Sequence, residues 1–218
     1  MGASRPSAHL RRCSSPWGSD VRLSPPAGAR TLNDVTDARS ASSTGSAGTV
    51  GPVVFLGDSL TEAGAWQEYF PHLDVVNAGR SGDTTADVQD RLDEVIERRP
   101  SVVVVMVGTN DFGLRATVEQ VVRGTENILW TLHHALPETR ILVVSVLPRE
   151  RERSEWIKQV NIHVRQFAPT VKAEFVDLWP QVADDDGELS RRYTHDRLHL
   201  NEDGYAVWAD ALRPYLSA

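Results

Sequence analysis

Ser59 stands at the end of an apolar run, where its hydroxyl could act as a nucleophile. The segment Val53–Leu56 reads as a buried strand, and Gly57 and Asp58 are turn residues that would lead the chain out of it. A structural interpretation competes with this one, because serine is also favoured as the N-cap of a helix. The choice depends on whether the chain carries partners that could activate the hydroxyl.

A histidine and an aspartate near the C-terminus could activate Ser59. Asp196 and His199 are three residues apart, so both side chains can emerge on the same side of a tight turn and form a hydrogen bond. A neutral imidazole can remove the proton of a serine hydroxyl, and a carboxylate can hold the ring in the required tautomer. His195 is the rival base, but neighbours in sequence usually point in different directions. We therefore predict Ser59 as nucleophile, His199 as base and Asp196 as its partner.

Attack of a serine on a carbonyl group produces an oxyanion, which needs hydrogen-bond donors already in place. Glycine at position 82 would permit close approach of the backbone to a ligand. The amide of Asn110 donates hydrogen bonds without adding charge or a titrating proton. The predicted donors are the backbone N–H groups of Ser59 and Gly82 and the side-chain amide of Asn110.

Three aspartates beside these positions are expected to be structural. Asp58 is predicted to accept backbone N–H groups in its turn, and Asp83 to be the N-cap of the next helix. Asp111 is predicted to shape the turn that aims Asn110. Asp177 also ends a predicted strand, but it has no histidine at close spacing.

From Gly51 onward, β-rich runs alternate with amphipathic stretches, which predicts an α/β three-layer sandwich. Nearly continuous apolar runs are typical of strands buried on both faces of a parallel sheet. Sites in such sheets form at the carboxyl ends of the strands, so the segments that follow them should meet. The expected strands are Val53–Leu56, Val75–Asn77, Val102–Val107, Ile141–Leu147 and Phe175–Asp177.

Helical spacing of apolar residues indicates four helices between or after these strands. They are expected at residues 88–99, from the capping box Thr117-x-x-Gln120 to residue 136, at residues 156–167, and from Asn201 onward. Tryptophans at helical spacing are expected to pack in the core: Trp130, Trp156 and Trp208. The charged segment Arg149–Glu155 is most simply a solvated loop, with a role at the substrate rim as the alternative.

Composition limits the classes of protein to which the chain can belong. Its 218 residues, 40% of them hydrophobic, suffice for one soluble domain with a substantial core. The formal net charge of −7 argues against a nucleic-acid partner, since such proteins carry a clustered basic face. Cys13 is the only cysteine, which excludes an internal disulfide and a cysteine-based zinc site. No phosphate-binding glycine motif or trusted metal-ligand spacing is present, so neither a cofactor nor a metal is expected.

The first part of the chain differs in composition from the rest. Of the first 50 residues, 26 are Ser, Gly, Ala or Pro. Such a segment cannot bury enough apolar surface to offset the conformational entropy that it would lose on folding. We predict a disordered extension over residues 1–49 and a folded domain over residues 50–218. No apolar run approaches the roughly 18 residues needed to cross a bilayer, and no secretory signal is recognised, so a cytoplasmic location is expected.

The strand-end segments together resemble the SGNH, or GDSL-type, hydrolase family, in the family's order. The resemblance covers Val53 to about Leu216, and it implies a flavodoxin-like sheet, metal-free ester hydrolysis and an acyl-serine intermediate. It also implies the roles already derived for the five predicted catalytic and oxyanion-hole residues. Finer detail is similar to the catalytic subunits of platelet-activating-factor acetylhydrolase and to bacterial thioesterase/lysophospholipase members. The segments that carry the family resemblance are Gly57-Asp58-Ser59-Leu60, Asn77–Gly82, Gly108-Thr109-Asn110-Asp111 and Asp196-x-x-His199. The finer likeness rests on Ser81–Thr85, Val107–Asn110, Leu147–Arg149, and Leu198–Leu200 followed by Gly204-Tyr205.

The leading functional hypothesis is a hydrolase of short-chain carboxylic esters, such as an O-acetyl group on a lipid or sugar. A thioesterase or acyltransferase could use the same machinery, and a noncatalytic binding module could keep the fold. Short connections after the strands suggest an open, shallow site and a small-molecule ester substrate; the oligomeric state stays open. The residues that could line a small acyl pocket are Leu60, Phe112, Leu114, Leu147 and Leu198.

Overall fold

A parallel sheet of five strands is the centre of the structure, a computed structural model that describes residues 51–217. The strand order is β2-β1-β3-β4-β5, which is the order of flavodoxin-like doubly wound sheets. The predicted fold class is therefore confirmed, whereas the predicted extension over residues 1–49 lies outside the described residues. The strands are β1 (Val53–Gly57), β2 (Val75–Gly79), β3 (Val102–Met106), β4 (Arg140–Val144) and β5 (Glu174–Val176).

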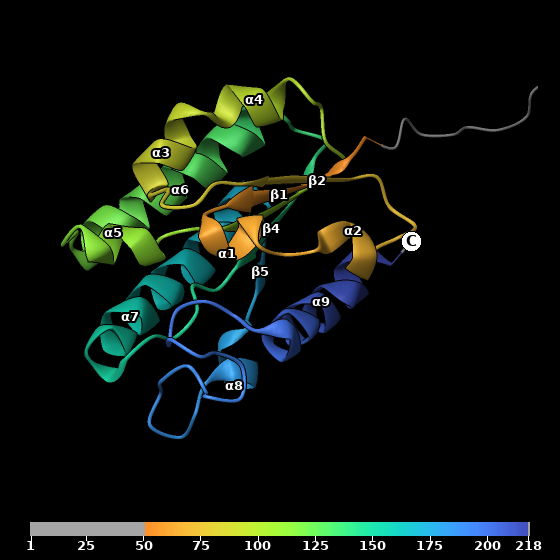
Figure 1. Cartoon of the computed structure of the whole chain (residues 1–218). Coiled ribbons are helices and arrows are strands. Elements are labelled where there is room, and N and C mark those ends of the chain that lie inside the picture. Colours follow the sequence, from red (N-terminus) through yellow and green to blue (C-terminus); the bar gives the residue numbers. More distant parts are fainter. Residues whose placement is uncertain (1–50, 218) are drawn as a thin grey trace, which may run out of the picture. The chain divides into compact units, whose positions relative to one another are not determined.

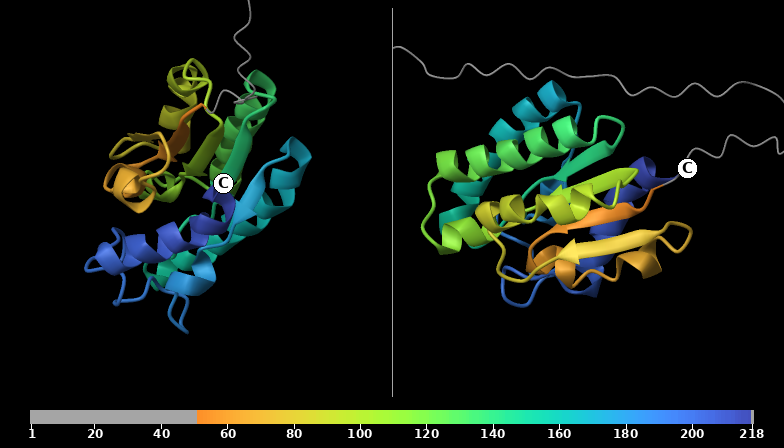
Figure 2. Two further views of the ribbon diagram at one scale, coloured as in Figure 1. Left: turned by 90° about the vertical axis from the view of Figure 1, so that its right-hand side faces the viewer. Right: turned by 90° about the horizontal axis from the view of Figure 1, so that it is seen from above.

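Helices cover both faces of this sheet and complete the three predicted layers (Figures 1 and 2). On one face lie α3 (Thr85–Asp90), α4 (Leu92–Ile96), α5 (Thr109–Gly113), α6 (Val118–Ala135), α7 (Arg151–Phe167) and the 3₁₀-helix η1 (Ala168–Val171). On the other lie α1 (Ser59–Glu62), α2 (Trp66–Tyr69), α8 (Trp179–Val182) and α9 (Glu202–Leu216).

Strand β1, which lies between β2 and β3, contributes side chains to both hydrophobic layers. Val54 and Leu56 pack with the aliphatic residues of α3, α4, α6 and α7, while Val53 and Phe55 pack with α1, α2 and α9. Successive side chains of a strand point to opposite faces, so an uninterrupted apolar run is required when helices cover both faces. The short run at the start of the domain therefore becomes the most deeply buried strand.

The layer that contains α2 and α9 is rich in stacked aromatic rings. Phe55 stacks on Trp66 with ring centroids 4.4 Å apart, and Trp66 meets Trp208 edge to face at 4.6 Å. Trp208 is 1% exposed, as predicted for a core residue. The same prediction is wrong for Trp130 and Trp156, which are 53% and 52% exposed. Helical spacing alone does not reveal which flank of an amphipathic helix another element covers.

Element boundaries differ from the predicted ones in two places that bear on the site. The helix expected at residues 88–99 is broken at Arg91, whose φ of −115° departs from helical geometry between α3 and α4. The strand expected to reach Leu147 ends at Val144, because the amide of Asn161 takes over the hydrogen bonds of the Val146 backbone.

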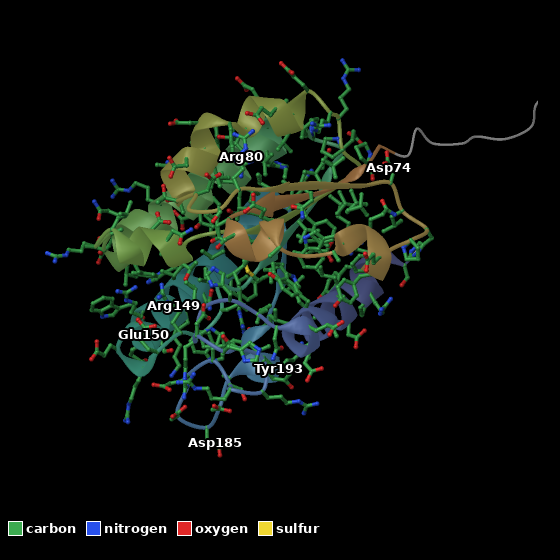
Figure 3. The ribbon with its side chains drawn as sticks, viewed as in Figure 1. Asp74, Arg80, Arg149, Glu150, Asp185 and Tyr193 are labelled. Carbon is green, nitrogen blue, oxygen red and sulfur yellow. The ribbon has the colours of Figure 1, made fainter. Side chains whose placement is uncertain are left out.

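The charged segment after β4 is largely helical, so its interpretation as a loop is wrong. Helix α7 begins at Arg151, and the two residues before it form an ion pair, Arg149 with Glu150 at 3.3 Å (Figure 3). The capping box predicted at Thr117 and the N-cap predicted at Asn201 are both present. Over residues 51–217, no helix combines the length and the apolar character needed to span a membrane.

Candidate active site

The predicted catalytic segments meet at the carboxyl ends of β1, β2 and β3. Ser59 opens α1 directly after β1, and Asn110 lies in α5 directly after β3. Strand β1 lies between β2 and β3. The connection that follows β1 runs over one face of the sheet through α1 and α2, whereas the connection that follows β3 runs over the other face through α5 and α6. In sheets of this order, the point where neighbouring connections diverge is the usual position of a ligand site.

The hydroxyl of Ser59 is available for chemistry because another residue caps the helix. Asp58 is the N-cap of α1, and its Oδ1 accepts the backbone N–H of Leu60 at 3.0 Å. The interpretation of Ser59 as a helix cap is therefore wrong, and the turn-forming role predicted for Asp58 is confirmed. Ser59 Oγ lies 3.3 Å from Nε2 of His199, a separation suited to proton transfer.

Asp196 and His199 form the hydrogen bond that their spacing predicts. Nδ1 of His199 lies 2.8 Å from Oδ2 of Asp196, and Oδ1 of Asp196 accepts the backbone N–H groups of Leu198 and His199 at 2.9 and 2.8 Å. Arg197, between them, has a left-handed backbone with φ of +64°, which lets the chain fold back so tightly. A carboxylate held on both oxygens fixes the ring that it contacts.

Thr194 anchors this turn and was not found by reasoning from the sequence. Its buried hydroxyl lies 2.6 Å from the carbonyl oxygen of His199 and accepts the backbone N–H of Arg197 at 3.0 Å. A hydroxyl that bonds the backbone three residues ahead is a known turn pattern, so the spacing from Thr194 to Arg197 was the available signal.

Hydrogen bonding sets the charge of the Asp196 carboxylate. Burial acts to raise its pKa, but hydrogen bonds from His199, Leu198 and Thr194 outweigh burial and hold the pKa well below its usual value. Asp196 is therefore ionised at neutral pH and can stabilise a positive charge on His199. The rival His195 is exposed, and its ring makes no hydrogen bond within residues 51–217.

Each of the three predicted oxyanion donors can offer an N–H group to a ligand. Within the described range, no hydrogen bond uses the backbone N–H of Ser59 or Gly82. The amide of Asn110 donates to the carbonyl oxygen of Asp83 at 2.9 Å, and its second N–H remains available. Gly82 has φ of +86°, and a Cβ there would contact nothing within 4 Å. Glycine is thus favoured at position 82 by its left-handed backbone, and the expected close approach of a ligand to that backbone stays a prediction.

Asn77 links the end of β2 to the helix that carries Ser59. Its amide donates to the carbonyl oxygens of Glu62 at 2.9 Å and Gly64 at 3.2 Å, and its Oδ1 accepts the N–H of Gly79 at 3.0 Å. The side chain of Asn77 therefore joins the end of β2 to the end of the helix that carries Ser59.

Asp83 and Asp111 have different structural roles. The N-cap of α3 is Thr84, so the prediction for Asp83 is wrong; its carboxylate is paired with Arg91 instead. Asp111 accepts the backbone N–H and the hydroxyl of Thr85, the latter at 2.6 Å, and so connects α5 to α3. In the part of the chain that the structure describes, no three His, Cys, Asp or Glu side chains are placed to hold a metal ion.

Replacing Asn110 with alanine is expected to lower kcat on an ester substrate by about 100-fold to 1000-fold, with little change in KM. The amide would bind the oxyanion of the transition state more strongly than the neutral carbonyl of the substrate. Steady-state kinetics of the two proteins measure this effect. An unchanged kcat would exclude Asn110 from the oxyanion hole.

Asp58 is buried beneath this site with one oxygen lacking a partner. It is 1% exposed, and within residues 51–217 its Oδ2 has no hydrogen-bond donor. Burial raises the pKa of Asp58 to about 7; the Asp111 carboxylate adds to this, while the N–H of Leu60 and the charge of His199 oppose it. The carboxyl is therefore more basic in the folded than in the unfolded chain.

Replacing Asp58 with asparagine is expected to remove a pH dependence of stability. The folded wild type binds more protons than the unfolded chain between pH 3.8 and about 7, so its free energy of unfolding falls as pH rises through that window. Relative to the wild type, Asp58→Asn should gain about 2 to 3 kcal/mol between pH 5 and pH 8. Urea unfolding at both pH values measures the gain, and a pH-independent difference would show that Asp58 is not the source.

The predicted acyl-pocket residues do not share one environment. Leu60 and Leu147 are 1% and 2% exposed and belong to the hydrophobic core, so they line no open pocket. Leu198 is partly buried beside His199, whereas Leu114 is 76% exposed. Phe112 and Leu114 each border an open cavity, but the two cavities are different ones.

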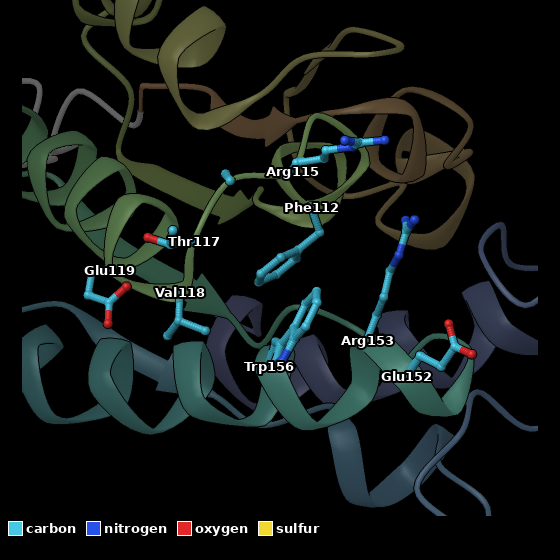
Figure 4. Close-up of a pocket in the computed structure, with 9 residues that line it drawn as sticks. Phe112, Arg115, Thr117, Val118, Glu119, Glu152, Arg153 and Trp156 are labelled. Carbon is cyan, nitrogen blue, oxygen red and sulfur yellow. The ribbon is translucent and has the colours of Figure 1, made fainter.

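This cavity of about 610 Å³ lies between α5 and the first turns of α7. Phe112 and Trp156 face each other across it with ring centroids 6.2 Å apart, and Arg115 and Arg153 project from opposite sides (Figure 4). Ser59 and His199 are not among its lining residues. The side chains of His199 and Asp196 are instead 49% and 52% exposed, so the site is open to solvent.

Comparisons with known proteins agree with this geometry. Residues 55–207 match the model of the GDSL-like Lipase/Acylhydrolase family. The platelet-activating factor acetylhydrolase IB subunit alpha1 of Homo sapiens is 37% identical over 174 residues, which cover 75% of this chain and 74% of that protein. The alpha2 subunit of Rattus norvegicus is 33% identical over 165 residues and covers 71% of each chain.

Solved structures share the same fold. A Streptococcus pneumonia protein described as a candidate platelet activating factor superposes with a TM-score of 0.69 at 29% identity, over 78% of this chain and 86% of its own. TesA is 19% identical and superposes with a TM-score of 0.62 over 76% of this chain and 98% of its own, which is a likeness of fold. Because the family match spans the sheet and every strand-end segment described above, the chain belongs to the GDSL-like lipase/acylhydrolase family of carboxylic-ester hydrolases.

Proposed function

We propose that this chain is a serine esterase that hydrolyses short-chain carboxylic esters through an acyl-serine intermediate. The observation that carries the proposal is the hydrogen-bonded series from Ser59 through His199 to Asp196. A nucleophile, its base and an orienting carboxylate in contact are the arrangement that acyl transfer requires.

The acylation step begins with attack of Ser59 Oγ on the carbonyl carbon of the ester. The proton of the hydroxyl passes to Nε2 of His199, and Asp196 stabilises the imidazolium. The carbonyl oxygen becomes an oxyanion, which receives hydrogen bonds from the Ser59 and Gly82 N–H groups and the Asn110 amide. Collapse of this intermediate breaks the bond to the alcohol oxygen. That oxygen takes the proton from His199 and leaves as the free alcohol.

Deacylation repeats these steps with water in place of the serine. His199, neutral again, removes a proton from a water molecule as the water oxygen attacks the acyl carbon. The second oxyanion uses the same donors, and its collapse returns the proton to Ser59 Oγ and releases the carboxylic acid. The half-exposed His199 side chain is accessible to such a water.

We infer that the acyl group is small, with acetyl as the first choice. The two relatives described above, at 37% and 33% identity, are named acetylhydrolases, and the catalytic pair is open to solvent, with neither Ser59 nor His199 lining the cavity beside Phe112. An open site offers little apolar surface to a long chain, so extra methylene groups gain little binding energy there. The alcohol half of the ester is a small molecule, such as a lipid or a sugar.

Hydrolysis of p-nitrophenyl esters from acetate to decanoate tests the proposal, with reactions lacking enzyme as the blank. The expected result is a kcat/KM maximum at acetate or butyrate. Rapid acid quenching should also yield protein heavier by one acyl group, located by peptide mass spectrometry on the peptide that contains Ser59. An optimum at octanoate or decanoate would contradict the short acyl group.

A matched pair of an oxygen ester and a thioester of the same acyl group separates two uses of the same machinery. A higher kcat/KM on the oxygen ester is expected. Preference for the thioester would identify a thioesterase, and acyl transfer to an added alcohol in place of water would identify an acyltransferase. Absence of turnover and of acylated protein on every ester would favour a noncatalytic binding module.

A further inference from the structure

Arg91 is a buried charge that the reaction steps above do not use. It lies at the junction of α3 and α4, and its side chain is 7% exposed. An arginine keeps its proton in proteins, so its burial is costly unless every contact compensates the charge. The buried guanidinium of Arg91 therefore needs hydrogen-bond partners that compensate its charge.

The partners of Arg91 come from two different strand ends. Its Nε donates to Oδ2 of Asp83 at 2.6 Å, and Asp83 is itself only 14% exposed. Its Nη2 donates to the carbonyl oxygen of Gly57 at 2.9 Å. The same carbonyl accepts the N–H of Arg80 at 3.0 Å. One guanidinium thus joins the end of β1 to the loop that follows β2.

Both anchor points adjoin the oxyanion donors. Gly57 precedes Ser59 by two residues, with Asp58 between them, and Asp83 directly follows Gly82. The carbonyl oxygen of Asp83 accepts the amide of Asn110. The guanidinium of Arg91 is therefore linked to the segments of all three donors. Its hydrogen bond to Gly57 leads to Ser59, and its ion pair with Asp83 leads to Gly82 and Asn110.

We propose that Arg91 is a positioning residue that sets the spacing of the oxyanion-hole donors, acting through Asp83 and Gly57. The inference rests on the proposed function, because the donors matter only if an oxyanion forms. Donors stabilise such an anion when they are held in place before the reaction, and an error of about 1 Å can cost on the order of 100-fold in rate. Charge-assisted hydrogen bonds from a planar fork are well suited to hold two loops at a fixed separation.

A role in stability alone is the competing explanation, since breaking a buried ion pair destabilises a fold. The two explanations differ in how the effect of Arg91 depends on Asn110. If Arg91 acts by aligning the donors, its substitution should lower kcat less when the Asn110 amide has already been removed. If it only stabilises the fold, its substitution costs the same whether the Asn110 amide is present or absent.

The experiment is a double-mutant cycle of Arg91→Met and Asn110→Ala, measured as kcat and KM on p-nitrophenyl acetate at a temperature where all variants are folded. Arg91→Met alone is expected to lower kcat about 10-fold to 100-fold with KM within about threefold. In the Asn110→Ala background, the same change should cost less than about threefold, because residues that act as a unit are non-additive.

Further variants keep the test decisive if Arg91→Met does not fold. Asp83→Asn removes the negative charge with the same shape and should show the same dependence on Asn110 with a smaller loss. Arg91→Lys keeps the charge but lacks the fork, so its kcat should lie between those of wild type and Arg91→Met. Arg140→Met is the matched control: it removes the ion pair with Glu174 at the start of β4 and should leave kcat unchanged.

Affinity for a trifluoromethyl ketone, which forms an oxyanion-bearing adduct with a serine, gives a second measure. Its inhibition constant should rise in parallel with the loss of kcat/KM in the Arg91 and Asp83 variants. Equal losses in both Asn110 backgrounds, or a lowered melting temperature with unchanged kcat, would overturn the positioning role while leaving the esterase intact. Lack of turnover by the wild type would overturn the proposed function, and the inference with it.

Discussion

Alanine at position 59 is expected to lower kcat on p-nitrophenyl acetate by about 10⁴-fold to 10⁶-fold. The reaction needs an oxygen nucleophile 3.3 Å from Nε2 of His199, and alanine supplies none. Water reaching the carbonyl from bulk solvent would be held less accurately, so the residual rate would come from substrate binding and the oxyanion donors. Steady-state assays at high enzyme concentration can measure a loss of this size.

Stability provides the control for this substitution. Asp58, and not Ser59, caps α1, so Ser59→Ala should leave the melting temperature within the error of the wild type. The variant should also fail to gain an acyl group on quenching with substrate. If Ser59→Ala retained a substantial part of the wild-type rate, the nucleophile would have to be another group or an activated water.

Alanine at position 199 is expected to lower kcat by a similar factor of about 10⁴ to 10⁶. Without the imidazole, no base among residues 51–217 forms a hydrogen bond with Ser59 Oγ, and the leaving alcohol loses the acid that would protonate it. The Asp196 carboxylate, held below its usual pKa, would have no imidazolium to stabilise. Because the serine and its base act as a unit, Ser59→Ala combined with His199→Ala should be little worse than either alone.

His195 offers a matched control for His199, since it is the other histidine of the same turn. Its side chain is exposed, so His195→Ala should keep kcat within about twofold, the range of a neutral surface substitution. Comparing the two variants on one substrate identifies the base without reference to the rest of the site. Loss of turnover in His195→Ala and not in His199→Ala would reverse the assignment.

Features that depend on neighbours in sequence were predicted correctly. The capping box at Thr117, the N-cap at Asn201 and the Asp196–His199 hydrogen bond each join residues three or four positions apart. Backbone geometry limits how such close residues can be arranged, so residue type and spacing are nearly sufficient. The prediction of Asp83 as an N-cap was wrong because two adjacent residues could cap α3. Thr84 is the N-cap, and the Asp83 carboxylate pairs with Arg91 instead.

Where the fold depends on distant contacts, spacing was insufficient. Helical periodicity did not show that Trp156 would face solvent across a cavity from Phe112, because another segment decides which flank of a helix is covered. Leu60 directly follows Ser59 in α1, yet its side chain packs in the core, as that of Leu147 does. Adjacent residues of a helix point in different directions, so closeness in sequence does not place a side chain in a pocket.

The sequence by itself determined the class of fold and which segments meet. Apolar runs alternating with amphipathic stretches specify parallel strands, whose carboxyl ends must share one edge, and this brings the segments of Ser59 and Asn110 to the same edge of the sheet. Only the tertiary structure decided how these groups are held. The contacts of Arg91 with Gly57 and Asp83, of Asn77 with Glu62, and of Asn110 with Asp83 join separate segments. Such contacts follow from the packing of whole elements, which no local spacing encodes.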